Sequence, residues 1–158
     1  MNTTEHTLHI AYKEFASVAD LPADDRTLMQ AAIDATATAY APYSHFHVGA
    51  AVRLAGGKIV KGSNQENAAY PSGLCAERTA LFAAGSQHPQ EAVTALAIVA
   101  RNEQGQLVEA APCGACRQVL LESQQRAGAA VRVLMYLDGG RIRMVDDAAT
   151  LLPFSFSM

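Results

Sequence analysis

All three cysteines of this 158-residue chain fall in two short segments, and this distribution constrains the fold more than any other feature. Cys75 is followed two residues later by Glu77, while Cys113 and Cys116 stand three residues apart behind Pro112. Each segment follows a loop and opens a stretch with helical spacing. We therefore expect two helix N-termini to lie side by side, so that the three thiols form one site.

Composition places the chain among globular proteins without a general affinity for nucleic acid. Its 158 residues suffice for one domain with one core, and hydrophobic residues make up 50% and charged residues 17%. The formal net charge of −3 lacks the basic excess on which general nucleic-acid binding depends. We expect no nucleic-acid partner.

The cysteine count and the N-terminal sequence indicate a reducing compartment. Three cysteines cannot form a complete disulfide framework. Residues 1–9 are polar and lack a secretory pattern, and no run approaches the roughly 20 apolar residues of a membrane span. We expect a cytoplasmic protein without a membrane partner, whose reduced thiols bind metal or carry out chemistry.

Helical and strand-like stretches alternate along the chain. The expected helices cover residues 24–41, 75–84 and 113–127, with one short helical turn at 147–152. The expected strands cover residues 48–54, 58–62, 92–100, 131–137 and 141–145. Gly85 and Gly128 are expected to end the second and third helices, and glycine pairs at 56–57 and 139–140 predict two hairpins.

This order of elements predicts an α/β fold, a three-layer α/β/α sandwich around a mixed five-stranded sheet. Residues 21–158 are expected to form a single domain, preceded by an extension over residues 1–20. Leu8, Ile10 and Tyr12 partly alternate in that extension, which permits an added strand, an arm against a neighbour, or a segment without function. The long loop over residues 63–73 is of the kind that often carries function.

The two cysteine segments favour a catalytic zinc site. Helix N-termini stabilise thiolates, the form of cysteine that binds zinc. Three protein ligands, Cys75, Cys113 and Cys116, leave one coordination position open, where zinc lowers the pKa of a water to about 7. Glu77 is close enough in sequence to act on that water without binding the metal. Because three thiolates over-neutralise the zinc charge, we predict that Arg78 donates to a ligand sulfur.

Other interpretations fit parts of this pattern. A lone Cys-x-x-Cys in a reducing compartment is also typical of a redox pair or of two buried thiols. A structural zinc site with a histidine as fourth ligand is a further alternative, although no histidine is spaced as a companion to a cysteine. The histidines are His6, His9, His45, His47 and His88.

The combined motifs resemble the cytidine deaminases, specifically the small homotetrameric type that acts on free nucleosides. Cys75-Ala76-Glu77 and Pro112-Cys113-Gly114-Ala115-Cys116 are similar to the all-cysteine form of the general zinc-deaminase signature. The resemblance extends from about residue 41 to residue 156. It implies that Glu77 is the catalytic residue and that the three cysteines hold one Zn²⁺ per subunit.

Three further segments resemble the free-nucleoside type, and they imply substrate contacts. The segment 43–51 places Phe46 against the pyrimidine ring, and 64–70 places Asn64 and Glu66 at the ribose hydroxyls. The segment 151–156 places Phe156 in a neighbouring subunit's site, with Phe154 where the family usually has a small residue. The resemblance also gives the backbone N–H of Ala76 a contact to the ring edge.

The implied reaction is zinc-dependent hydrolytic deamination of cytidine and deoxycytidine to uridine and deoxyuridine plus ammonia, in pyrimidine salvage. Glu77 transfers the protons, and a homotetramer shares its active sites between subunits. Two alternatives stay open at this point. One is a deaminase of a polynucleotide base or of a small heterocycle, which the net charge and the Asn-x-Glu loop disfavour; the other is a non-enzymatic binding module stabilised by zinc.

Overall fold

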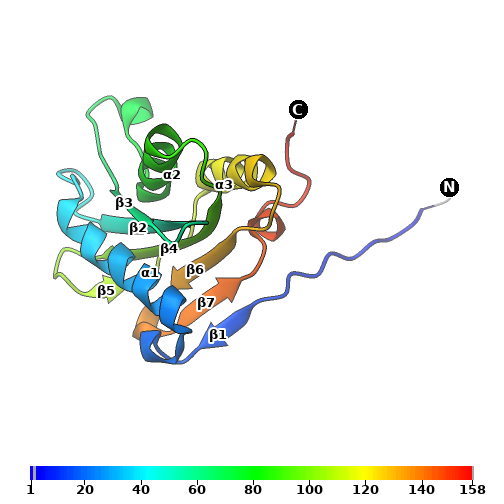
Figure 1. The fold of residues 1–158 in the computed structure, drawn as a ribbon, viewed down its shortest axis with the longest axis horizontal. Coiled ribbons are helices and arrows are strands. Elements are labelled where there is room, and N and C mark those ends of the chain that lie inside the picture. Colours follow the sequence, from blue (N-terminus) through cyan, green and yellow to red (C-terminus); the bar gives the residue numbers. More distant parts are fainter. Residues whose placement is uncertain (2, 158) are drawn as a thin grey trace.

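One mixed sheet organises the structure, a computed structural model that describes Met1 and residues 3–157 (Figure 1). Asn2 and Met158, which fall in the two predicted segments 1–20 and 21–158, lie outside the described residues. The helices are α1 (Ala23–Ala35), α2 (Ala76–Gln87) and α3 (Gly114–Ala127). The strands are β1 (Lys13–Phe15), β2 (His47–Leu54), β3 (Ile59–Ser63), β4 (Val93–Arg101), β5 (Leu107–Val108), β6 (Arg132–Tyr136) and β7 (Ile142–Val145).

The strand order is β1-β7-β6-β4-β2-β3, with β5 paired to β4 outside this path. Strands β4 and β6 are parallel, because α3 lies between them in the chain and returns it to the same end of the sheet. The other pairs are antiparallel. The predicted mixed α/β fold is confirmed, as are the hairpins β2–β3 and β6–β7.

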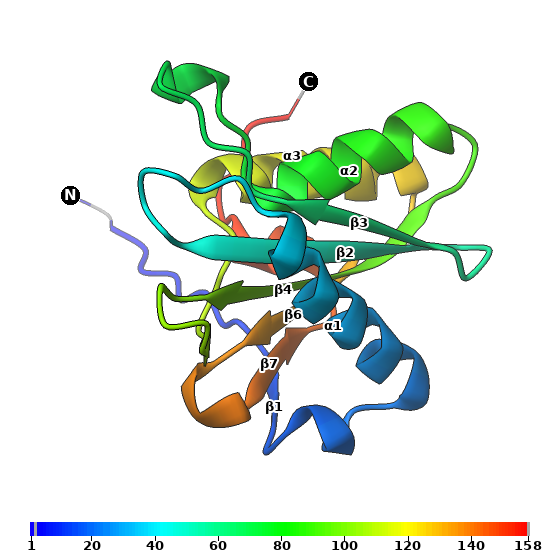
Figure 2. The same ribbon diagram turned by 90° about the vertical axis from the view of Figure 1, so that its left-hand side faces the viewer.

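Helices lie on both faces of this sheet, with α1 on one face and α2 and α3 on the other (Figure 2). The alternation of side chains along β4 explains how one strand serves both faces. Leu96 and Ile98 pack with Ala80 of α2, while Ala97 and Val99 pack with the residues of α1. No helix among the described residues has the length and the apolar character needed to cross a membrane.

Several sequence predictions need correction. The sheet has seven strands rather than five, because the short strand β1 pairs with β7 and the short strand β5 pairs with the end of the central strand β4. Helix α2 does not stop at Gly85 but continues to Gln87. Helix α1 ends at Ala35 and is followed by a short 3-10 turn, so the predicted helical stretch up to residue 41 is too long.

Residues 13–20 of the extension join the folded body, with Phe15 and Val18 packed against the core. Only Lys13–Phe15 joins the sheet, whereas residues 3–12 contain no regular structure and are exposed (Figure 1). Tyr12 lies under the guanidinium carbon of Arg143, 5.0 Å from the centre of its ring. A short added strand is therefore present, next to an extended arm.

Two glycines let the helices approach the sheet closely. A Cβ on Gly62 of β3 would stand 2.6 Å from the carbonyl oxygen of Ala76 and closer still to the backbone of Ala80. On the opposite face, a Cβ on Gly49 of β2 would stand 2.7 Å from the backbone nitrogen of Thr36. Because no side chain intervenes, Gly62 determines how closely the first turns of α2 approach the sheet.

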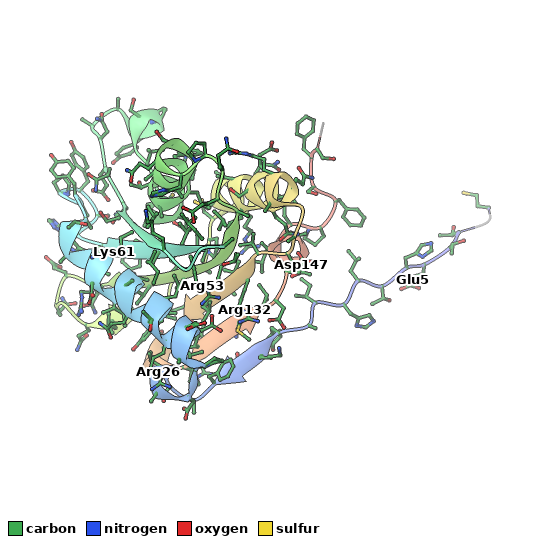
Figure 3. The ribbon with its side chains drawn as sticks, in the orientation of Figure 1. Glu5, Arg26, Arg53, Lys61, Arg132 and Asp147 are labelled. Carbon is green, nitrogen blue, oxygen red and sulfur yellow. The ribbon has the colours of Figure 1, made fainter. Side chains whose placement is uncertain are left out.

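A buried carboxylate ties α1 to the sheet beneath it. Asp25 has 1% of its side chain exposed and accepts hydrogen bonds from Arg53 at 3.0 Å and from Arg132 at 2.8 Å. Arg53 and Arg132 converge from different strands below α1 (Figure 3). Both carboxylate oxygens are thus paired, as a buried charge requires.

Candidate active site

A cavity of about 670 Å³ opens beside the N-terminus of α2. It is bordered by the start of β2, the loop between β3 and α2, and the segment that precedes α3. Eight of the ten predicted site residues line it: Phe46, Asn64, Glu66, Cys75, Ala76, Glu77, Arg78 and Cys113. The two others lie elsewhere, Cys116 buried in α3 and Phe156 in the C-terminal segment.

The three cysteines meet where two helices begin. Cys75 directly precedes α2 and Cys113 directly precedes α3, while Cys116 lies in the first turn of α3 and is fully buried. Their sulfur atoms all lie within 4.8 Å of one another. The Cys75–Cys113 and Cys113–Cys116 sulfur distances are 3.8 Å and 3.5 Å.

This sulfur cluster has the dimensions of a zinc site. In tetrahedral coordination with Zn–S distances of about 2.3 Å, neighbouring sulfurs stand about 3.8 Å apart. The Cys75–Cys113 separation of 3.8 Å matches that value and the Cys113–Cys116 separation of 3.5 Å is slightly shorter, and thiolate sulfur is a preferred zinc ligand. The cluster could therefore hold one zinc ion, with three protein ligands and one open position.

Nearby groups already stabilise negative charge on one sulfur. Hydrogen bonds from Cys116, Arg78 and Cys113 lower the pKa of Cys75 to about 5. The hydrogen bond between Cys116 and Cys75, together with burial, raises the pKa of Cys116.

Arg78 takes the position predicted for it beside a sulfur. Its Nη2 donates to Cys75 Sγ at 3.7 Å. Its Nε is buried and has no hydrogen-bond partner in the described part of the chain. A buried, unsatisfied guanidinium N–H close to the sulfurs of Cys75 and Cys116 suits a site that carries more negative charge, as it does when all three cysteines are thiolates.

Glu77 stands in the first turn of α2 with only 2% of its surface exposed. Burial raises its pKa to about 7, and the charge of Cys75 acts in the same direction. Hydrogen bonds from its own backbone N–H and from Cys116 act in the opposite direction. A carboxyl group that titrates near 7 can both accept and donate a proton at neutral pH.

Asn64, at the start of the loop that borders the cavity, is hydrogen-bonded to the backbone where β2 begins. Asn64 Oδ1 accepts from the backbone N–H of Val48 at 2.8 Å, and its Nδ2 donates to the carbonyl of Phe46 at 2.9 Å. Asn64 thereby fixes the backbone on either side of His47, which places the Phe46 ring at the cavity. Its side chain retains one N–H and one lone pair for a ligand.

Glu66 is anchored to the turn that precedes β2. It accepts from the backbone N–H groups of Tyr43 and Ser44 at 2.9 and 3.3 Å, and from the Ser44 hydroxyl. The Ser44 hydroxyl, followed by these N–H groups, lowers the pKa of Glu66. Glu66 is therefore an anion at neutral pH, with about one lone-pair site left for a hydroxyl donor.

Several lining residues were not singled out from the sequence. Tyr43 and Tyr70 form an edge-to-face pair at the cavity, with ring centres 6.3 Å apart. The segment 109–111, directly before Pro112, forms another part of the wall. Its position directly before a cysteine segment was the only available signal, because β5 was not predicted.

Comparisons with known proteins agree with this geometry. The family model for the cytidine and deoxycytidylate deaminase zinc-binding region matches residues 22–131. A cytidine deaminase of Halalkalibacterium halodurans is 46% identical over 99 residues, which is 63% of this chain and 71% of that protein. One from Sporosarcina psychrophila is 50% identical over 84 residues, 53% of this chain and 58% of that protein. The crystal structure of cytidine deaminase from Burkholderia pseudomallei matches with a TM-score of 0.71 and 40% identity, covering 82% of this chain and 97% of that one.

Proposed function

The chain belongs to the cytidine and deoxycytidylate deaminase family, and we propose that it hydrolyses cytidine and deoxycytidine to uridine and deoxyuridine, with release of ammonia. One observation carries this proposal. The three-sulfur cluster and the buried Glu77 share a cavity with Phe46, Asn64 and Glu66. This arrangement supports the proposal that nucleoside binding and deamination, a step of pyrimidine salvage, take place in one cavity.

We assign the metal to the three cysteines and proton transfer to Glu77. When bound by three protein ligands, zinc lowers the pKa of a water in its open position to about 7. Glu77 accepts a proton from the attacking water and delivers it to N3, which makes C4 electrophilic. The water oxygen bonds to C4, and Glu77 then passes the hydroxyl proton to the amine. The C4–N bond breaks, leaving a carbonyl at C4 and free ammonia.

We assign substrate orientation to the cavity walls. Phe46 packs on the pyrimidine ring, and the backbone N–H of Ala76 contacts the ring edge. The unused hydrogen-bonding capacity of Asn64 and Glu66 suits the ribose hydroxyls. Because Glu66 is ionised, a phosphate at the same place would be repelled, which favours free nucleosides over nucleotides and nucleic acid.

We further propose a cytoplasmic homotetramer with one zinc per subunit, in which Phe156 enters a neighbour's site. Phe156 is 69% exposed and does not reach the cavity of its own chain, which leaves it free for such a contact. The three free thiols support a reducing compartment. Helices on both faces of one continuous sheet support a single domain over residues 21–158 and a three-layer α/β/α arrangement.

The decisive experiment follows the loss of ultraviolet absorbance when the protein is mixed with cytidine or deoxycytidine. We expect turnover of both nucleosides and at least tenfold lower kcat/KM for cytosine base, cytidine monophosphate and single-stranded DNA. Faster turnover of the base or of DNA would instead favour the heterocycle or polynucleotide alternative. No turnover of any of these compounds by zinc-loaded protein would refute the proposal.

Metal removal separates a catalytic site from a structural one. We expect that chelation abolishes turnover, that the circular dichroism of the fold persists, and that added zinc restores the rate. A structural zinc module would unfold when the metal is removed. Sedimentation of the active protein tests the tetramer, and an active monomer would exclude shared active sites.

A further inference from the structure

The C-terminal segment, residues 147–156, is attached to α3 by three side-chain hydrogen bonds. The acceptors of these bonds lie near the start, the middle and the end of the C-terminal segment. They are Gln124 Nε2 to Asp147 Oδ1 at 2.7 Å, Arg117 Nη1 to the Leu151 carbonyl at 3.0 Å, and Gln118 Nε2 to the Phe156 carbonyl at 3.1 Å. Asp147 lies where the chain leaves the sheet and turns toward α3 (Figure 3). Arg117 and Gln124 are seven positions apart and lie on the same side of α3, while Gln118 lies about 100° around the helix from Arg117.

Only one of these donors also reaches the cysteine loop. Arg117 Nε donates to the carbonyl of Pro112 at 2.8 Å, while its Nη1 is bonded to Leu151. Pro112 directly precedes Cys113, and Arg117 directly follows Cys116. One planar guanidinium therefore joins the loop that ends in a cysteine to the segment that leads to Phe156.

Cys113 depends on this bond more than the other cysteines do. Cys116 is buried and Cys75 is partly buried, whereas Cys113 is exposed. Packing therefore constrains Cys113 least, and its position depends on the backbone that carries it. The buried Pro112 carbonyl is part of that backbone, and the rigid fork of Arg117 fixes its direction.

We propose that Arg117 is a positioning residue that holds Cys113 and the C-terminal segment in one fixed arrangement. Its two bonds tie the direction of Cys113 Sγ to the path of residues 151–156. The part of this proposal that concerns Phe156 rests on the proposed function, in which that ring completes a neighbour's site. Arg117 thus couples metal retention to substrate binding although it contacts neither the metal nor the substrate.

Three methionine variants provide a matched test, because each keeps an unbranched side chain and removes the donor. Arg117→Met removes both bonds, Gln118→Met removes only the bond to Phe156, and Gln124→Met removes only contacts distant from the cysteines. The measurements are the rate at which zinc-loaded protein loses zinc to a chelator, and kcat and KM for cytidine.

We expect zinc release about 10- to 100-fold faster in Arg117→Met, the usual effect of losing a group that orients a metal ligand. Release should stay within about twofold of wild type in Gln118→Met and Gln124→Met. KM should rise several-fold in Arg117→Met and in Gln118→Met, with kcat of the zinc-loaded Gln118→Met protein little changed. In Gln124→Met, KM should not change.

Two results would overturn the proposal. One is wild-type zinc release in Arg117→Met, and the other is equal acceleration in Gln124→Met, which would indicate general loosening of α3. If Arg117→Met does not fold, Arg117→Lys replaces it, because one ammonium cannot span both carbonyls in the fork geometry; it should release zinc at an intermediate rate. If the wild-type protein does not deaminate cytidine, the proposed function fails, but the zinc-release comparison still decides the role of Arg117 in holding Cys113.

Discussion

Replacing Gly62 by alanine should impair catalysis from a position outside the cavity lining. The new Cβ would stand 2.6 Å from the Ala76 carbonyl oxygen and closer still to the Ala80 backbone nitrogen, whereas ordinary contacts begin at about 3.4 Å, so α2 must retreat by at least about 0.8 Å. The obstruction is backbone rather than a flexible side chain, and it lies within the first turns of α2. Because Glu77 is carried by the same turn, it must move with the helix.

The overlap at Gly62 should lower both stability and turnover. Overpacking of this kind costs about 1–3 kcal/mol of stability. A displacement of about 1 Å can reduce turnover roughly 100-fold. We therefore expect Gly62→Ala to lower kcat for cytidine at least tenfold while the protein remains folded.

Gly49→Ala is the matched control on the other face of the sheet. Its Cβ would press on the carbonyl oxygen of Ala32 in α1 and would stand 2.7 Å from the backbone nitrogen of Thr36, and α1 carries no predicted site residue. We expect a comparable loss of stability with kcat within about twofold of wild type.

Urea unfolding and steady-state deamination, both at a temperature where each variant is folded, provide the comparison. The reasoning is refuted if Gly62→Ala loses stability but keeps wild-type kcat, since the helix would then have moved without affecting proton transfer. It is equally refuted if Gly49→Ala loses as much kcat as Gly62→Ala.

Three further predictions follow from single side chains. Glu77→Gln should retain zinc, measured by metal analysis, and lose about 10²–10⁴-fold in kcat; more than a tenth of the wild-type rate would exclude Glu77 as the proton carrier. Asp25→Asn should lower the free energy of unfolding in urea by about 3 kcal/mol, because two arginines lose their buried partner, with kcat unchanged. The pKa of Glu66 is lowered from its ordinary value of 4.5, so ionised Glu66 stabilises the fold at pH values above 4.5. This contribution is lost as the pH falls through the lowered pKa. Ser44→Ala removes the main cause of that lowering, so acid unfolding should begin at a higher pH; an unchanged acid midpoint would contradict the assignment.

Local signals in the sequence explain which parts of the fold were predictable. The glycine pairs at 56–57 and 139–140 lie between strands that do form hairpins, and Gly128 ends α3 in the left-handed conformation with φ of 64°. The cysteine segments were placed correctly at two helix starts because loop residues and Pro112 precede them. In each case the deciding residues are neighbours in the chain.

The errors arise where a distant part of the molecule decides. Strands of two and three residues, β5 and β1, are too short for a detectable period, and they form because β4 and β7 offer unpaired backbone groups to them. Helix α2 passes through Gly85 because a glycine costs only about 1 kcal/mol in a helix, less than the packing of the helix on the sheet contributes. Tyr43 and Tyr70 meet only after the loop over 63–73 folds against the turn before β2.

Asp25 shows the same limit for a charged residue. At the start of a helix an acidic side chain is favoured by the helix dipole, and the local sequence around Asp25 indicates nothing more than this. In the structure the side chain is buried, and its partners Arg53 and Arg132 stand 28 and 107 positions away in the chain. No local pattern indicates such a pair, since only the sheet order brings β2 and β6 under α1.

The two faces of the sheet therefore differ in what mutations should change. The face under α2 and α3 carries the cysteines and Glu77, and its geometry depends on close backbone contact at Gly62. The face under α1 carries the Asp25 ion pairs, which lie outside the cavity lining. Because one sheet separates them, loss of stability on the α1 side should leave the reaction intact, whereas small displacements on the α2 side should slow it before the fold is lost. Asp25→Asn should thus lower the free energy of unfolding and leave kcat unchanged, whereas Gly62→Ala should lower kcat at least tenfold while the protein remains folded.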